Sequence, residues 1–159
     1  MTRSRSCPQF VKAMTAAEAL NMHRSKLTMF EMAEISQYDA IYTIGGFRAK
    51  QSMTQKDGTY KAHVGEQLKY RYEVRSGAGK GAFGQVLKCA DMKENGRMVA
   101  IKISKAEQSE TENAQIEAKF LTKIANRNPD RYSLVKAYDR FFFRHHFFIV
   151  TELLDINLY

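Results

Sequence analysis

From Tyr70 onward the chain alternates aromatic or apolar side chains with charged ones, and this period of two predicts a strand. Two more β-type runs cover residues 85–90 and 98–103. Between them, the dipeptide Asn95-Gly96 is a strong hairpin signal, because both positions of the favoured turn need positive φ. The three runs therefore predict an antiparallel meander.

A helical period follows the third run. Ser109 and Glu112 match the capping-box pattern, in which a hydroxyl and a carboxylate satisfy each other's backbone amides, and Pro129 predicts the helix end. Two further strands are expected over residues 133–143 and 147–151. The order predicts an α+β fold with a five-stranded antiparallel sheet and one helix. The expected buried stripe of the helix is formed by Ile116, Phe120, Leu121 and Ile124.

The first part of the chain has a different pattern. Thr15 with Glu18 and Thr28 with Glu31 each match a capping box and predict two short helices. Apolar positions are few and irregularly spaced there, so we expect this segment to dock on a larger unit. The chain is thus expected to comprise a flexible N-terminus (1–14), a small, mainly helical accessory segment (15–68) and a sheet-bearing lobe (69–159).

Composition narrows the class of protein. The chain has 159 residues, of which 44% are hydrophobic and 26% charged, enough for one ordinary globular core. No apolar run approaches the ~18 residues of a membrane span, and the N-terminus lacks a signal-peptide core, so we expect no membrane association. Cys7 and Cys89 cannot build a disulfide framework or a zinc site. Both are expected to be free thiols in an intracellular protein, cytoplasmic or nuclear.

The formal net charge of +8 raises the question of nucleic-acid binding. The basic residues are scattered, and no aromatic RNA-binding signature, zinc-finger spacing or basic heptad region accompanies them. We therefore expect a solvated basic surface and no nucleic-acid partner. A basic nucleic-acid binder is the weakest of the alternatives.

The first candidate site is a glycine-rich stretch. Gly79, Gly81 and Gly84 with Val86 give G-x-G-x-x-G-x-V, in which missing side chains let backbone N–H groups approach phosphate oxygens. A dinucleotide-binding fingerprint would continue into a helix, whereas this stretch continues into a predicted strand. The spacing of a Walker A loop is absent. A glycine-rich hairpin without a ligand stays open as an alternative.

Lys102 ends a V-A-I-K run on the third predicted strand, where a fixed ammonium can neutralise nucleotide α- and β-phosphates. Ala100 would leave room for an adenine ring. A lysine in such a cleft needs a carboxylate partner, and Glu117 on the predicted helix is placed for that role. Glu110 and Glu112 are rivals for this role, but they lie in the first turn of the predicted helix, where carboxylates complement the helix dipole.

The last predicted strand continues into a linker whose exposed backbone groups could bind an adenine edge, although taken alone it is an ordinary strand end. ATP is therefore the expected ligand. The expected nucleotide site consists of Ala78, Gly79, Lys80, Gly81, Ala82, Phe83, Gly84, Val86, Ala100, Lys102, Glu117, Thr151, Glu152, Leu153 and Leu154.

These motifs establish a resemblance to eukaryotic protein kinases, and residues 28–159 resemble the dual-specificity tyrosine-regulated kinases, the DYRK family, in its class with an N-terminal autophosphorylation accessory region. GTYKAHVGEQLKYRYEV is similar to the DYRK homology box, and LTMFEMAEISQYDAIYTIGGFRAK is similar to the accessory segment. AQIEAKFL, FFFRHHFF and TELLDINLY also carry the resemblance. The resemblance implies the N-terminal lobe of a kinase, with a five-stranded sheet and helix C.

The resemblance further implies an enzyme that uses ATP and Mg²⁺, phosphorylates Ser or Thr of protein substrates, and phosphorylates its own activation-loop tyrosine. The accessory region is expected to pack on the lobe and support that step. The sequence departs from the family at two places. Gly77 and Ala78 replace a bulky aliphatic residue before the first loop glycine, and Thr151 occupies the gatekeeper position, where the family usually has Phe.

No H-R-D-x-x-x-x-N and no D-F-G follow the linker, although these motifs supply the catalytic base and the metal ligands of a kinase. We expect the catalytic aspartate and the metal ligands in a missing C-lobe, and a chain that binds ATP without transferring phosphate. The alternative to a kinase fragment is a non-catalytic nucleotide-binding scaffold, similar to a pseudokinase.

Overall fold

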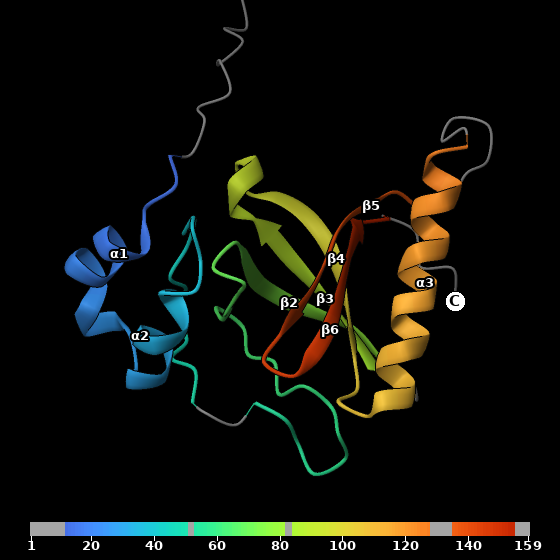
Figure 1. The fold of residues 1–159 in the computed structure, drawn as a ribbon, viewed down its shortest axis with the longest axis horizontal. Helices are drawn as coiled ribbons and strands as arrows, with labels where there is room; N and C mark the ends of the chain where they lie inside the picture. Colours follow the sequence, from blue (N-terminus) through green and yellow to red (C-terminus); the bar gives the residue numbers. More distant parts are fainter. Residues whose placement is uncertain (1–11, 51–52, 82–83, 128–134, 155–159) are drawn as a thin grey trace, which may run out of the picture.

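A computed structural model describes residues 12–50, 53–81, 84–127 and 135–154 (Figure 1). The predicted α+β class is confirmed. Cys7, Ala82, Phe83 and Pro129, together with the start of the strand predicted from residue 133, lie outside the described residues. The elements are α1 (Ala16–His23), η1 (Arg24–Lys26), α2 (Met29–Ile35), β1 (Gln67–Leu68), β2 (Tyr72–Gly81), β3 (Gly84–Asp91), η2 (Met92–Glu94), β4 (Arg97–Ser104), α3 (Gln108–Ala125), β5 (Ala137–Phe143) and β6 (His146–Glu152).

The sheet has six strands in the order β1-β2-β3-β4-β6-β5, and neighbouring strands are antiparallel. The five predicted strands are present, and the additional strand is the two-residue β1, which pairs with β2. The expected strand start at Tyr70 is wrong, because Lys69 and Tyr70 have φ of 56° and 52° and form the β1–β2 turn. The alternating pattern correctly indicated that the side chain of Tyr70 is buried. It did not indicate the backbone conformation of this residue.

The link between β3 and β4 has the predicted left-handed residues, with φ of 56° at Asn95 and 77° at Gly96. It is longer than a two-residue hairpin because η2 precedes these residues. Asp91 caps η2 by accepting a hydrogen bond from the Lys93 amide at 3.2 Å. The meander is therefore confirmed with a broader turn than the dipeptide indicated.

Helix α3 differs from its prediction at both its start and its buried face. Glu107 is the N-cap residue and makes no side-chain cap, so the capping box assigned to Ser109 is wrong. Ile116 and Phe120 are 64% and 63% exposed, whereas Ala114 and Ala118 are buried. The helix lies close to the sheet, against Phe147 and Ile149, and short side chains permit this approach better than bulky ones. Leu121 and Ile124 of the predicted stripe are partly buried.

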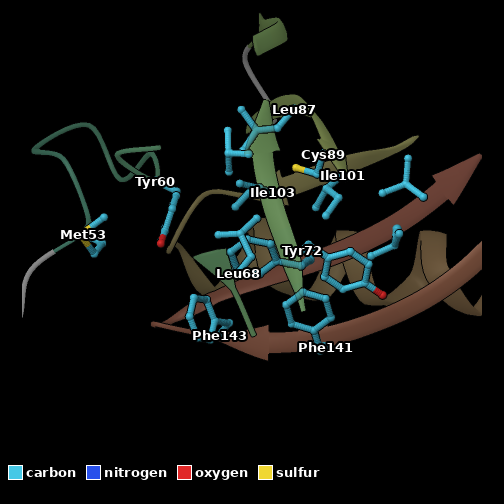
Figure 2. Packing of buried hydrophobic residues seen from close by; sticks show 14 of the residues in the cluster. Met53, Tyr60, Leu68, Tyr72, Leu87, Cys89, Ile101, Ile103, Phe141 and Phe143 are labelled. Carbon is cyan, nitrogen blue, oxygen red and sulfur yellow. The ribbon is translucent and has the colours of Figure 1, made fainter. Parts of the chain in front are cut away.

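Strand register divides the side chains of the sheet between two faces. Val86, Lys102 and Ile149 are directly paired and share one face, as do Ala100 and Thr151. Figure 1 shows α3 along one side of the sheet and α1 and α2 at the opposite side of the molecule. The other face carries the main core, in which strand residues pack on the segment before β2 (Figure 2): Ala49, Met53, Tyr60, Leu68, Tyr72, Val74, Leu87, Cys89, Val99, Ile101, Ile103, Phe141, Phe143, Phe148 and Val150.

Both capping boxes predicted in the N-terminal segment are confirmed, at Thr15 with Glu18 and at Thr28 with Glu31. Glu31 is buried and also accepts a hydrogen bond from the Ala49 amide at 3.0 Å. A second apolar cluster joins both helices to the β1–β2 turn through Ala19, Leu27, Ile35, Ile41, Ile44 and Tyr70. Within the described ranges, no helix has both the length and the apolar character needed to cross a bilayer.

Candidate functional site

The structure brings Lys102 and Glu117 together. Lys102 Nζ donates a hydrogen bond to Glu117 Oε2 at 2.7 Å. Strand β4 holds Lys102 between its partners in β3 and β6, and α3 presents Glu117 from above that face of the sheet. The two side chains are 38% and 43% exposed, so solvent screens their attraction. Glu117 therefore faces the sheet as predicted, but it lies at an open surface and is not enclosed by apolar neighbours.

The glycine-rich stretch forms the β2–β3 hairpin, where Gly81 pairs with Gly84 and Gly79 with Val86. The glycines differ in what the fold requires of them. Gly84 has φ of 135°, and a Cβ added there would overlap the carbonyl oxygen of Ile103. A Cβ at Gly79 or Gly81 would meet nothing within 4 Å, and neither residue has positive φ. The fold thus needs glycine at position 84 and leaves the space beside Gly79 and Gly81 open.

A cleft of about 420 Å³ lies beneath this hairpin. Eight of the residues predicted for the site line it: Ala78, Gly79, Val86, Ala100, Thr151, Glu152, Leu153 and Leu154. Lys88 and Val135 also line it and were missed. Strand alternation could have indicated Lys88, which follows Val86 by two residues and pairs with Ala100 on the same face. Val135 carries no comparable sequence signal.

Lys102 and Glu117 line a second hollow, of about 330 Å³, between α3 and the sheet. It lies next to the cleft, because Lys102 follows Ala100 by two residues on the same strand face. The other residues that line it are Ser104, Glu110, Asn113, Ala114 and Ile149. Glu110, a rival acid in the sequence, thus lies in this hollow without pairing to Lys102. Lys80, Gly81 and Gly84 line neither space, and nothing is described for Ala82 and Phe83.

Hydrogen bonds occupy polar groups at the end of β6, where the predicted linker begins. The Glu152 amide donates to the Lys136 carbonyl at 2.9 Å, and the Glu152 carboxylate accepts from the Lys136 amide at 2.8 Å. Thr151 Oγ1 donates to the Glu152 carbonyl oxygen at 3.3 Å. The Glu152 N–H is therefore bonded to Lys136, the residue before β5, and is not free to bind a ligand, although Glu152 lines the cleft together with Leu153 and Leu154.

No protein-family profile matches the chain. The human dual specificity tyrosine-phosphorylation-regulated kinase 4 is 37% identical over 92% of the chain, and the DYRK-family kinase pom1 of Schizosaccharomyces pombe is 39% identical over 87%. The chain belongs to the DYRK family of protein kinases. A further DYRK relative, mbk-2 of Caenorhabditis elegans, is 33% identical over 89% of the chain.

The chain spans 30% of the human DYRK kinase, 14% of pom1 and 19% of mbk-2. Ala78 and Thr151, two residues at which the sequence departs from the DYRK pattern, line the cleft. A Cβ at Gly77 would meet nothing within 4 Å, so the place of the missing aliphatic side chain is open space.

Proposed function

We propose that this lobe binds ATP beneath the glycine hairpin and that it serves a dual-specificity protein kinase, which transfers the γ-phosphate to Ser, Thr or Tyr hydroxyls of protein substrates. The observation that carries the proposal is the 2.7 Å pair of Lys102 and Glu117 beside an open cleft. An ammonium held in place by a carboxylate is the arrangement that binds α- and β-phosphates in kinases. If the pair bound no ligand, such an exposed contact would contribute only about 0–1 kcal/mol to the stability of the fold.

The glycine hairpin supports the same reading. Gly79 is not required by the fold, because its φ is not positive and a Cβ there would meet nothing within 4 Å. Glycine in an unstrained strand weakens it by about 0.5–1 kcal/mol relative to alanine. A ligand that approaches the backbone closely would account for glycine at this position, and a phosphate chain is such a ligand.

The cleft beside the pair suits an adenine ring. Val86 and Ala100 lie on the same sheet face and offer apolar contact above a planar base, and the short side chain of Ala100 leaves room for it. Leu153 and Leu154 supply the linker backbone at the cleft edge. Thr151 also lines the cleft, and its small side chain would leave space there for a ligand.

Mg²⁺ bound to ATP would neutralise charge on the phosphates. The described residues gather no cluster of three or more His, Cys, Asp or Glu, and we assign no metal ligand to them. The described residues bind and orient the nucleotide in this proposal and carry no step of phosphoryl transfer. The thiol of Cys89, free and buried, agrees with an intracellular protein.

Titration of the chain with the fluorescent analogue TNP-ATP, and its displacement by ATP, tests the proposal. Lys102→Met removes the ammonium, and we expect binding to be weaker by at least about tenfold, because a charge-assisted hydrogen bond contributes about 1.5–3 kcal/mol. Lys123→Met is the matched control, since this exposed lysine on α3 lines neither hollow, and it should bind like the unchanged chain. Equal affinity of the Lys102→Met variant and its control would exclude the proposed site.

A further inference from the structure

A small hairpin over residues 53–61 follows α2 and precedes β1 in the chain. The Lys61 amide donates to the Met53 carbonyl at 2.7 Å, and the Gln55 amide donates to the Thr59 carbonyl at 2.8 Å. At the tip, Gly58 has φ of 81°, and Asp57 Oδ1 accepts a hydrogen bond from the Thr59 hydroxyl at 2.6 Å. These bonds give the 53–61 hairpin a defined shape.

The tip of the 53–61 hairpin holds the connection that leads into α3. The Ala106 amide donates to the Gly58 carbonyl at 2.9 Å. Ala106 immediately precedes Glu107, the N-cap residue of α3, whose own side chain makes no capping bond. The entry into the helix is therefore anchored by a backbone bond from outside the helix, in place of a local cap.

The base of the hairpin is bonded to the strands on either side of Lys102. Thr54 Oγ1 lies 2.9 Å from His146 Nε2, and His146 Nδ1 lies 2.8 Å from the Ser104 carbonyl oxygen. Because that carbonyl can only accept, Nδ1 carries the proton and Nε2 accepts from the Thr54 hydroxyl. Burial lowers the pKa of His146, which agrees with a neutral ring. Gln85 Nε2 also donates to the Tyr60 carbonyl oxygen, which connects the hairpin to β3.

The packing of α3 itself constrains its position weakly. The buried side chains of its sheet face are Ala114 and Ala118, which pack on Phe147 and Ile149. Alanine side chains give little interlocking between a helix and a sheet, so such a helix can shift at small cost. Glu117 projects from this helix, and a shift of α3 would move its carboxylate away from Lys102.

We propose that the 53–61 hairpin is a positioning device for α3: by holding the helix entry at Ala106 and the strand ends at Ser104 and His146, it keeps Glu117 in contact with Lys102. The effect on nucleotide binding rests on the proposed function, whereas the effect on α3 does not. Thr54 and Gly58 are positioning residues in this scheme, because they contact the elements that carry the pair and not the pair itself.

Hydrogen exchange measured by mass spectrometry on the chain tests the anchor without any nucleotide. Gly58→Ala strains the tip at φ of 81°, and Gly96→Ala is the matched control, with φ of 77° in open space at the far turn of β4. We expect exchange over residues 106–125 to be about tenfold faster in Gly58→Ala than in the control, because the backbone penalty of about 1–2 kcal/mol falls on the α3 anchor. Thr54→Val, which keeps the side-chain shape, should show the same change at smaller size.

Equal exchange over α3 in Gly58→Ala and Gly96→Ala, at equal thermal stability, would overturn the proposal. A second arm measures TNP-ATP affinity in a double-mutant cycle of Gly58→Ala with Glu117→Gln. If the hairpin acts through Glu117, Gly58→Ala weakens binding in the unchanged chain and adds no loss to Glu117→Gln. Additive losses would also overturn it. If no variant binds TNP-ATP, the proposed function is contradicted. Hydrogen exchange over α3 then still tests whether the 53–61 hairpin holds the helix.

Discussion

Two charged clusters in this chain differ in almost every physical respect. Arg144, 3% exposed in the β5–β6 turn, donates two hydrogen bonds to Glu34 of α2 and one to Glu66, each at 2.9 Å. Lys102 and Glu117 form a single contact at 2.7 Å with about two fifths of each side chain exposed. One cluster joins the N-terminal segment to the sheet, and the other lies at an open cleft.

The buried cluster satisfies its polar atoms internally. Tyr70 donates its hydroxyl proton to Glu34 at 2.8 Å, and Tyr60 donates to Glu66. Burial beside these carboxylates raises the pKa of both tyrosines, which therefore stay neutral donors. A buried charge that loses its partner costs far more than an exposed one. The Arg144 cluster therefore stabilises the fold, whereas the Lys102 pair can exchange partners with a ligand at little cost to the fold.

Removal of the buried guanidinium is expected to have the largest effect. Arg144→Met leaves Glu34 and Glu66 buried without a cation, and we expect a loss of about 3–5 kcal/mol in the free energy of unfolding. Arg140→Met on the exposed face of β5 is the control and should cost less than about 0.5 kcal/mol. Urea denaturation followed by circular dichroism measures both. A loss below about 1 kcal/mol for Arg144→Met would show that the two clusters do not differ as described.

The buried cluster should also make stability depend on pH. Burial raises the pKa of Glu66 from 4.5 to about 7, although Arg144 and Tyr60 oppose this. Since the folded state holds the proton more tightly than the unfolded state, the stabilisation from Glu66 is complete below pH 4.5 and is lost as pH rises to about 7. The change corresponds to about 3 kcal/mol.

Glu66→Gln provides the reference, because glutamine does not titrate. We expect the unfolding free energy of the unchanged chain, minus that of Glu66→Gln, to fall between pH 4.5 and pH 7 and to be constant above that range. Denaturation at a series of pH values measures the difference. A difference that rises with pH would mean that the attraction of Arg144 outweighs burial.

Local sequence rules predicted most of the elements, with the capping box at Ser109 as an exception. Capping boxes at Thr15 and Thr28 depend on residues three apart, and the meander depends on alternation along each strand. The predicted buried face of α3 was wrong because the space between the helix and the sheet depends on Phe147 and Ile149, which lie in β6, far away in the sequence. A helical period in the sequence cannot tell whether alanine or a bulky residue fills a shallow contact.

The candidate site was predictable where a motif fixes residue types, as at Lys102 and Glu117, which are 15 positions apart. The Arg144 cluster was not predictable, because its partners Glu34 and Glu66 are 110 and 78 positions away and no spacing rule relates them. Gly58 was missed for the same reason, since the role proposed for its carbonyl is to accept a hydrogen bond from the distant Ala106 amide. Long-range polar contacts follow from the assembled fold and leave no periodic signal.

Two glycines of the cleft hairpin differ in the same way as the two charged clusters, because the fold requires Gly84 and does not require Gly79. Gly84→Ala places a Cβ against the Ile103 carbonyl oxygen at φ of 135°, and we expect a loss of about 1–3 kcal/mol in unfolding free energy. Gly79→Ala is the matched variant, and it should leave stability unchanged or raise it by about 0.5 kcal/mol. Thermal denaturation measures both. Equal losses for the two variants would mean that the fold, and not a ligand, requires glycine at position 79.

The smallest expected effect is the stability change at the open pair. Lys102→Met and Glu117→Gln should each lower the unfolding free energy by less than about 1 kcal/mol, since solvent reaches both side chains and compensates for the lost contact. Urea denaturation under the conditions used for Arg144→Met gives the direct comparison. A loss of several kcal/mol at either position would make the pair a structural cluster like that of Arg144. A negligible loss, combined with the weaker TNP-ATP binding expected for Lys102→Met, would mean that the pair is retained for the ligand.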